Sequence, residues 1–264
     1  MAIKINTKLV LRANNPVDCL LQFDAAALPD QSLEILRRNF SQRITAGFPA
    51  QDYIGERSWI RFEGELEIDY EASVRIDRIN PILPDQSALP PHALPRETVP
   101  YLFDSRYCPA SKFQSFALSK FVDIQGGARI AAISDWIASH VSYEAGVSDA
   151  STGAQDTFLE RRGICRDFAH LLIALARASS TPARFVSCYA PGVEPQDFHA
   201  VAEVFLADPT RDDGGYWHIV DATGMASPED TVKIGVGRDA ADVSFMTSFG
   251  PVDLIEKSVK VIQE

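Results

Sequence analysis

The chain has few cysteines, and no two of them are closely spaced. Four occur among 264 residues, at positions 19, 108, 165 and 188. This density is too low for a small scaffold held together by disulfides, so free thiols in a reducing compartment are expected. The first residues also lack the charged segment and following apolar stretch of a secretory signal. Together these absences predict a cytoplasmic protein.

Long apolar runs, metal-binding pairs and phosphate-binding loops are missing as well. No uninterrupted apolar stretch approaches the roughly 18 residues of a membrane span. There is no Cys-x-x-Cys or His-x-x-x-His pair, and no Gly-x-x-x-x-Gly-Lys-Ser/Thr loop. Lys and Arg number 25 against 36 Asp and Glu, and the net charge of −11 argues against general nucleic-acid binding. We therefore expect no cofactor or metal, no membrane association and no nucleic-acid partner.

The first hundred residues form a β-rich region. Hydrophobic residues make up 46% and charged residues 23% of the whole chain, which is typical of a globular protein. Four early segments are partly alternating, and turn signals such as Asn14-Asn15-Pro16 separate some of them, which favours an antiparallel β-sandwich. Residues 32–40 fit either a short helix or another strand. The four segments are residues 3–11, 17–23, 59–70 and 74–79.

A proline-rich stretch separates this region from the rest of the chain. Seven prolines occur between residues 81 and 109, in a segment with little periodicity. Such a composition is typical of an inter-domain connection that is extended and partly packed. We therefore place an N-terminal β-sandwich domain at residues 1–100 and a second domain at residues 101–264.

A predicted helix begins at Cys165. Apolar residues recur after it with the spacing of a helix buried along one stripe, and Gly163 stands just before it, where a tight turn is easily made. In the first turn of a helix, the dipole and the free backbone N–H groups favour a thiolate and could hold an oxyanion. The alternative is a small buried cysteine in an ordinary core helix. The apolar positions are Phe168, Ala169, Leu171, Leu172, Leu175 and Ala176.

A histidine and an aspartate stand at the ends of two predicted strands. Residues 199–206 and 216–221 have the β-branched and aromatic content of strands, and a turn signal follows the second. If these strands are antiparallel, His199 at the start of one and Asp221 at the end of the other meet at one edge of a sheet. Separately they fit a surface histidine and an Asx turn. Together with Cys165 they supply a nucleophile, a base and an orienting carboxylate.

The sequence resembles the transglutaminase-like cysteine enzymes, in particular bacterial proteins with an N-terminal β-domain. The resemblance runs from about residue 101 to about residue 250 and rests on four motifs in fixed order. It implies a papain-like α+β fold, in which the helix carrying the nucleophile packs on an antiparallel sheet. It also implies Cys165 as nucleophile, His199 as general base and acid, and Asp221 as the orienting residue. The motifs are Arg-Arg-Gly-Ile-Cys-Arg-Asp-Phe-Ala-His at 161–170, Thr-Pro-Ala-Arg at 181–184, His-Ala-Val-Ala-Glu-Val at 199–204 and Trp-His-Ile-Val-Asp-Ala-Thr at 217–223.

The resemblance further implies an acyl-transfer enzyme that acts on amide bonds of peptides or proteins through a thioester. Many members carry Trp two residues after the catalytic His, where this chain has Val201. Because an aromatic ring there could shield the thioester from water, hydrolysis by a peptidase or amidase is favoured over cross-linking. The alternative is a non-catalytic transglutaminase-like module that binds a peptide or protein. The sequence leaves the substrate, the oligomeric state and any regulation open.

Four other residues near the expected site have two interpretations each. Tyr143, just after a predicted helix over residues 127–141, could be a second oxyanion donor or lie outside the cleft. Arg238 could bind substrate or order the C-terminal loop. Trp136 is expected in the core rather than as a substrate platform, and His170 is expected to make a structural hydrogen bond.

Overall fold

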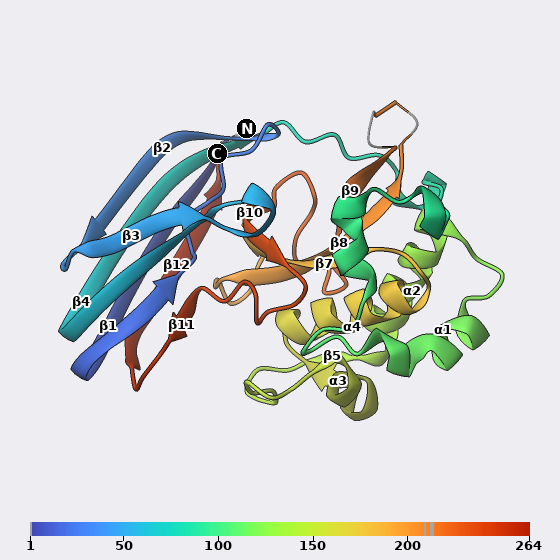
Figure 1. Ribbon diagram of the computed structural model, residues 1–264. Coiled ribbons are helices and arrows are strands. Elements are labelled where there is room, and N and C mark those ends of the chain that lie inside the picture. Colours follow the sequence, from blue (N-terminus) through green and yellow to red (C-terminus); the bar gives the residue numbers. More distant parts are fainter. Residues whose placement is uncertain (1, 209, 212–213) are drawn as a thin grey trace.

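The protein folds into two antiparallel sheets and a group of helices. The computed structural model describes residues 2–208, 210–211 and 214–264. A large curved sheet lies on one side, a smaller sheet occupies the centre, and helices lie beyond the smaller sheet (Figure 1). In this described part of the chain, no helix is long and apolar enough to cross a membrane. The architecture confirms the predicted α+β class with a β-rich N-terminal region.

The larger sheet is built from both ends of the chain. Its strand order is β11-β1-β4-β2, with β12 also paired to β1 and β3 to β4, and every pairing is antiparallel. The N- and C-termini therefore lie side by side at one corner of this sheet (Figure 1). The strands are β1 Ala2–Leu21, β2 Gln31–Phe40, β3 Ile44–Pro49, β4 Glu56–Ile76, β11 Met246–Ser248 and β12 Asp253–Gln263.

Two long strands replace the four short segments that the sequence predicts in this sheet. The Asn14-Asn15-Pro16 signal does not end β1; instead, the register of β1 against β4 shifts between Ala13 and Val17, which is a β-bulge. Across from the bulge, Gly64 has a φ of 75°, which a residue with a side chain rarely adopts, and so lets β4 bend without ending. Residues 32–40, left open by the sequence, lie in β2, where pairing with β4 settles their structure.

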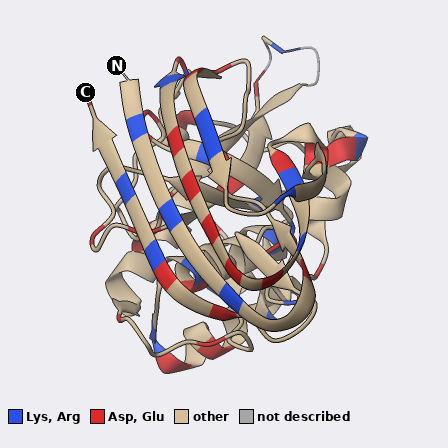
Figure 2. Cartoon of the chain, turned by 90° about the vertical axis from the view of Figure 1, so that its left-hand side faces the viewer, with Lys and Arg blue, Asp and Glu red and all other residues tan. Residues whose placement is uncertain are grey.

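The larger sheet has one charged face and one apolar face. On the charged face, side chains of opposite charge pair between neighbouring strands: Lys8 pairs with Glu256 and Arg12 with Glu65, each at 2.9 Å (Figure 2). The apolar face packs against the smaller sheet in one shared core. Strands β1 to β4 therefore lie in one layer, and the smaller sheet supplies the layer that packs against it. The shared core includes Ile5, Leu9, Ile60, Leu66 and Ile68 with Tyr189, Val232 and Ile234.

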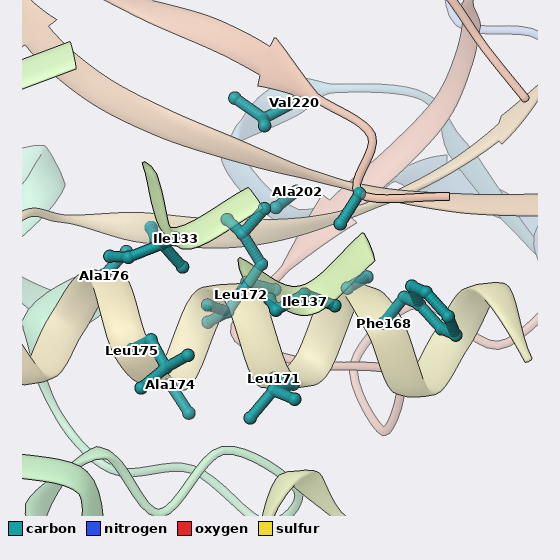
Figure 3. Close-up of a cluster of buried hydrophobic side chains, with 14 of the residues drawn as sticks. Ile133, Ile137, Phe168, Leu171, Leu172, Ala174, Leu175, Ala176, Ala202 and Val220 are labelled. Carbon is teal, nitrogen blue, oxygen red and sulfur yellow. The ribbon is translucent and has the colours of Figure 1, made fainter. Parts of the chain in front are cut away.

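The smaller sheet is covered on both faces. Its order is β10-β7-β8-β9, all antiparallel, and its two central strands are almost wholly buried, as expected for a sheet between two layers. Helix α4, Cys165–Ala178, packs on one face against β7 and β8, and it is buried on its other sides as well, so that Phe168, Leu171 and Leu172 all belong to one core (Figure 3). The strands are β7 Ala183–Tyr189, β8 His199–Ala207, β9 Gly215–Val220 and β10 Val232–Gly237.

The remaining elements surround α4 and bridge the two sheets. Helix α2, Gly126–His140, matches the predicted helix, and Trp136 is buried in the core as expected. The proline-rich connection is packed through Tyr101, which is 1% exposed. The division at residue 100 remains a prediction, but β11 and β12 lie in the N-terminal sheet. The other elements are α1 Gln114–Lys120, α3 Ala154–Glu160, β5 Ser142–Tyr143, β6 Arg162–Gly163 and the 3-10 helices η1 Gln51–Tyr53, η2 Leu83–Asp85, η3 Pro91–Ala93, η4 Arg96–Leu102 and η5 Ala110–Phe113.

Candidate active site

Cys165 is the first residue of α4, as predicted, and its neighbours fix the start of that helix. The backbone N–H of Ile164 donates to Oδ2 of Asp167 at 2.9 Å, which satisfies a donor that the helix itself cannot. The chain enters the helix through Gly163, where a Cβ would lie 2.7 Å from the Cβ of Asp167. Close packing therefore requires a glycine at position 163. The tight turn that the sequence suggested is not the reason, because the φ of Gly163 is not in the left-handed region. Cys165 is partly exposed, whereas the other three cysteines are buried.

His199 and Asp221 meet across the edge of the smaller sheet. His199 is the first residue of β8, and Asp221 directly follows the last residue of β9. These strands are antiparallel, with Ala202 opposite Val220. The next pair in this register is Val201 with Asp221, whose side chains point to the same face of the sheet. Because side chains alternate along a strand, His199, two residues before Val201, also points to that face. The Nε2 of His199 lies 2.9 Å from Oδ2 of Asp221, so the meeting that the sequence predicts occurs.

The Asp221 carboxylate is held by the turn that follows β9. Its Oδ1 accepts the backbone N–H and the hydroxyl of Thr223 at 2.9 and 2.8 Å, and its Oδ2 accepts the N–H of Ala226 at 2.9 Å. Burial raises the pKa of Asp221, but hydrogen bonds from His199 and Thr223 outweigh burial and lower it below the usual value. The Asx turn considered as an alternative is therefore also present, and it fixes the carboxylate against the imidazole.

The His199 ring uses one nitrogen for Asp221 and leaves the other free. Burial lowers the pKa of His199, while the hydrogen bond to Asp221 and the nearby Cys165 thiol raise it, with a net value of about 9. Among the described residues, Nδ1 has no hydrogen-bond partner. The ring therefore carries an oriented, basic nitrogen beside the thiol, as a nucleophile and base pair requires.

Tyr143 lies beside Cys165 but is not among the residues that line the cleft at this thiol. Strand β5 pairs with β6, so Tyr143 stands next to Gly163, two residues before the cysteine. Burial raises the pKa of Tyr143 to about 12, with further contributions from the Cys165 thiol, while a hydrogen bond from the Cys165 backbone N–H lowers it. The phenol and this N–H thus share the space beside the sulfur.

A cleft of about 400 Å³ opens beside the thiol. Cys165 and His199 line it, together with side chains from the segment before η5 and from the loop between β10 and β11. A second hollow, of about 450 Å³, lies on the larger sheet and contains no cysteine or histidine. Among the described residues, no group of three His, Cys, Asp or Glu side chains could hold a metal ion.

Two of the other candidate residues have structural contacts. The structure does not bring Arg238 to the cleft: its guanidinium pairs with Asp242 at 2.9 Å, so Arg238 orders the loop, which was the other interpretation. His170 is fully buried, and its Nε2 accepts the N–H of Ala240 at 3.1 Å, as expected of a structural histidine. Sequence reasoning missed Arg106 and Phe245, which line the cleft from loops without periodicity.

Comparison with known proteins places these residues in a described family. The sequence model of the Transglutaminase-like superfamily matches residues 122–222, which include Cys165, His199 and Asp221. The whole structure is similar to a candidate cysteine protease from Cytophaga hutchinsonii, with a TM-score of 0.88 and 31% sequence identity. That match covers 99% of this chain and 90% of the other.

Two mycobacterial proteins of uncharacterized function are similar over shorter stretches. One, from Mycobacterium leprae (strain TN), is 28% identical over 119 residues, which is 44% of this chain and 42% of that protein. The other, from Mycobacterium tuberculosis (strain ATCC 25618 / H37Rv), is 33% identical over 112 residues, which is 39% of this chain and 35% of that protein. The chain therefore matches less than half the length of these curated relatives.

Proposed function

Since the chain belongs to the transglutaminase-like superfamily, we propose that it is a cysteine-nucleophile enzyme that cleaves amide bonds of peptides or proteins through a thioester. One observation carries the proposal. The Nε2 of His199 is held by Asp221 at 2.9 Å, which leaves Nδ1 free beside a partly exposed cysteine at the start of a helix. Acyl transfer by a cysteine enzyme uses a nucleophile, a base and an orienting carboxylate in this relation.

Acylation begins with transfer of the thiol proton to His199, or with a thiolate–imidazolium pair of Cys165 and His199 that exists before the substrate binds. The Cys165 sulfur attacks the amide carbonyl carbon, a C–S bond forms, and the carbonyl π electrons move to oxygen. The backbone N–H of Cys165, with the Tyr143 hydroxyl, stabilises this oxyanion. When the carbonyl re-forms, the C–N bond breaks and His199 returns its proton to the leaving nitrogen. Ammonia or an amine departs, and a thioester remains on Cys165.

Water is the acceptor that we favour for the second step. His199 removes a proton from water, and the oxygen attacks the thioester carbon. The C–S bond breaks with its electrons going to sulfur, a carboxylic acid leaves, and the protonated His199 is again paired with the Cys165 thiolate or returns its proton to it. Val201 supports this choice, because its side chain is small and buried among Val186, Ile219 and Val236. It therefore cannot supply the aromatic cover that would protect the thioester from water.

The peptide or protein substrate and the cytoplasmic location are parts of the same proposal. The free thiol of Cys165 is needed for the chemistry, and the three buried cysteines are also unpaired. A reducing compartment preserves such thiols.

Site-resolved alkylation with iodoacetamide over a range of pH tests the proposal. Cys165 should react rapidly well below pH 8.5, the approximate pKa of a free thiol, and His199→Ala should slow this reaction near neutral pH. The buried Cys19, Cys108 and Cys188 are internal controls, which should label only after unfolding. If Cys165 reacts like an ordinary exposed thiol, and His199→Ala changes nothing, the chain is better described as a binding module.

A further inference from the structure

We propose that the cleft beside Cys165 selects substrates that carry a carboxylate group close to the scissile amide, and that Arg106 is the residue that binds it. This inference rests on the proposed function and defines its substrate class. The carboxylate could be the terminal α-carboxylate of a peptide or an acidic side chain. Both have the same planar pair of oxygen acceptors that a guanidinium recognises.

The charge of the cleft lining is opposite to that of the whole protein. The chain has a net charge of −11, yet the cleft is lined by Arg106 and Arg166 and by no Asp or Glu. Because Asp and Glu outnumber Lys and Arg in the chain, a cleft of average composition would include carboxylates in its lining. The lining therefore presents positive potential next to the nucleophile, which favours anionic groups.

Two carboxylates that neighbour lining residues in the sequence, Asp239 and Asp167, are occupied by other partners. Asp239 accepts the N–H groups of Tyr107 and Ala241 at 2.8 and 3.0 Å. Asp167 accepts Ile164 N–H and lies 3.2 Å from the guanidinium of Arg166. The charge of Arg166 is thus balanced within the protein.

Arg106 differs from Arg166 because its charge is not balanced. Its guanidinium carbon lies 4.9 Å from the centre of the Tyr107 ring, and within the described residues it has no carboxylate partner. A cation on an aromatic face is held without being neutralised. Arg106 is therefore available to bind an anionic ligand in the cleft.

The ring beneath Arg106 is fixed in place. The Tyr107 hydroxyl donates to the carbonyl oxygen of Ala150 at 2.7 Å, and the ring stacks on His170 with centroids 5.0 Å apart. Tyr107 is buried, so its ring is a rigid support. A pre-positioned guanidinium loses less conformational freedom when it binds than a mobile one does.

Aromatic side chains in the same cleft strengthen the attraction. Phe198 and Phe245 line the cleft and stack with ring centroids 4.9 Å apart. A substrate that fills the cleft displaces water from these rings and from Arg106. The charge pair then lies in a medium of lower dielectric, where its attraction increases.

Binding to an inactive protein tests the inference separately from catalysis. Three peptide mixtures, in which Xaa is any uncharged residue, are offered to the Cys165→Ser protein at low salt: acetyl-Xaa-Gln-Xaa-Gly with a free α-carboxylate, the same mixture as C-terminal amides, and amides with Glu in place of the last Gly. The bound fraction is identified by mass spectrometry. We expect one or both carboxylate mixtures to be enriched at least about tenfold over the neutral one. The mixture that is enriched distinguishes the terminal from the side-chain carboxylate.

Substitution of Arg106 gives the decisive comparison. In the Cys165→Ser background, Arg106→Gln should abolish the enrichment, whereas Arg96→Gln, at a side chain 94% exposed, should leave it unchanged. Equal retention of charged and neutral mixtures, or an enrichment that survives Arg106→Gln, would overturn the inference. Wild-type protein is then incubated with the same mixtures. Carboxylate enrichment without an adduct on Cys165 or cleavage would contradict the proposed function alone, and cleavage without charge preference would contradict this inference alone.

Discussion

A methyl group on Gly163 would lie 2.7 Å from the Cβ and 2.9 Å from the Oδ2 of Asp167. The same Oδ2 accepts the N–H of Ile164 at 2.9 Å, so Gly163 makes room for the carboxylate that closes the start of α4. Asp167 is fully buried and cannot move into solvent. The position of Cys165 therefore depends on a glycine two residues earlier.

Gly163→Ala should displace the start of α4 and lower amide turnover by about a hundredfold, because a displacement of roughly 1 Å is costly at a nucleophile. The free energy of unfolding should fall by about 1–3 kcal/mol, as for other overpacked sites. Turnover and urea unfolding measure the two effects. Gly47→Ala is the control, since its Cβ would have no neighbour nearer than 3.9 Å. Wild-type turnover in Gly163→Ala would show that the packing of Asp167 does not position the thiol.

Asp221→Asn should shift the alkaline limb of the pH–rate profile to lower pH. The ionised Asp221 helps to raise the pKa of His199 to about 9, so removing its charge lowers that pKa. The protonated imidazole that the leaving nitrogen needs is then lost at a lower pH. The maximal rate should also fall by on the order of 10³–10⁴, because the ring loses its orienting carboxylate. The measurement is single-turnover acylation between pH 5 and 10, and an unchanged alkaline limb would refute the coupling.

Tyr143→Phe should lower kcat by about 10- to 100-fold and leave KM nearly unchanged, if the hydroxyl acts only on the oxyanion. The alkylation rate of Cys165 should change little, because iodoacetamide displaces iodide and forms no oxyanion. Steady-state kinetics and alkylation are compared in the same preparations. Equal losses in both assays would mean that Tyr143 holds the thiol in place and does not stabilise the transition state.

The sequence predicts the positions of the candidate site residues in their helix and strands well. Cys165, His199 and Asp221 each stand at an element boundary, and the elements show a strong apolar period or a clear turn signal. Such signals depend on neighbours a few residues apart and are therefore readable. The contact between His199 and Asp221 is also predictable, because two strands that follow each other in the sequence usually pair as antiparallel neighbours.

Long-range features could not be predicted in the same way. The return of β12 to pair with β1 depends on contacts across the whole chain, such as Ile5 opposite Val261. The bulge at Asn14-Asn15-Pro16 has the composition of a turn. Whether such a segment forms a turn or a bulge depends on whether a partner strand pairs with the residues on both sides of it. Arg106 reaches the cleft from a loop, where no periodicity marks a functional side chain.

The least predictable feature is a group of buried charged side chains on strands of the smaller sheet. Glu203, Arg184 and Lys233 are each less than 10% exposed, and Glu203 contacts both cations. Arg184 also stacks 4.0 Å from the centre of the Trp217 ring and pairs with Asp52 of η1 at 3.0 Å. Charged residues on a strand are normally expected at the surface. Here each charge has a partner, and the group joins three strands of the small sheet to a segment of the N-terminal region.

Glu203→Gln should lower the free energy of unfolding by about 3–5 kcal/mol, because Arg184 and Lys233 would be left buried without this carboxylate. Glu65→Gln is the control: Glu65 and Arg12 are about half exposed, so the loss should be below about 1 kcal/mol. Chemical unfolding of both variants gives these values.

The pH dependence of unfolding separates the charge of Glu203 from its packing. Burial raises the pKa of Glu203, but the charges of Arg184 and Lys233 outweigh burial and lower it to about 2. A carboxyl group with a depressed pKa stabilises the fold above its unfolded value of about 4.5 and loses this contribution as the pH falls towards 2. The difference between wild type and Glu203→Gln should therefore be constant at neutral pH and shrink below about pH 4.5. A difference that stays constant down to pH 3 would mean that the glutamine disturbs packing and that the ion pairs contribute little.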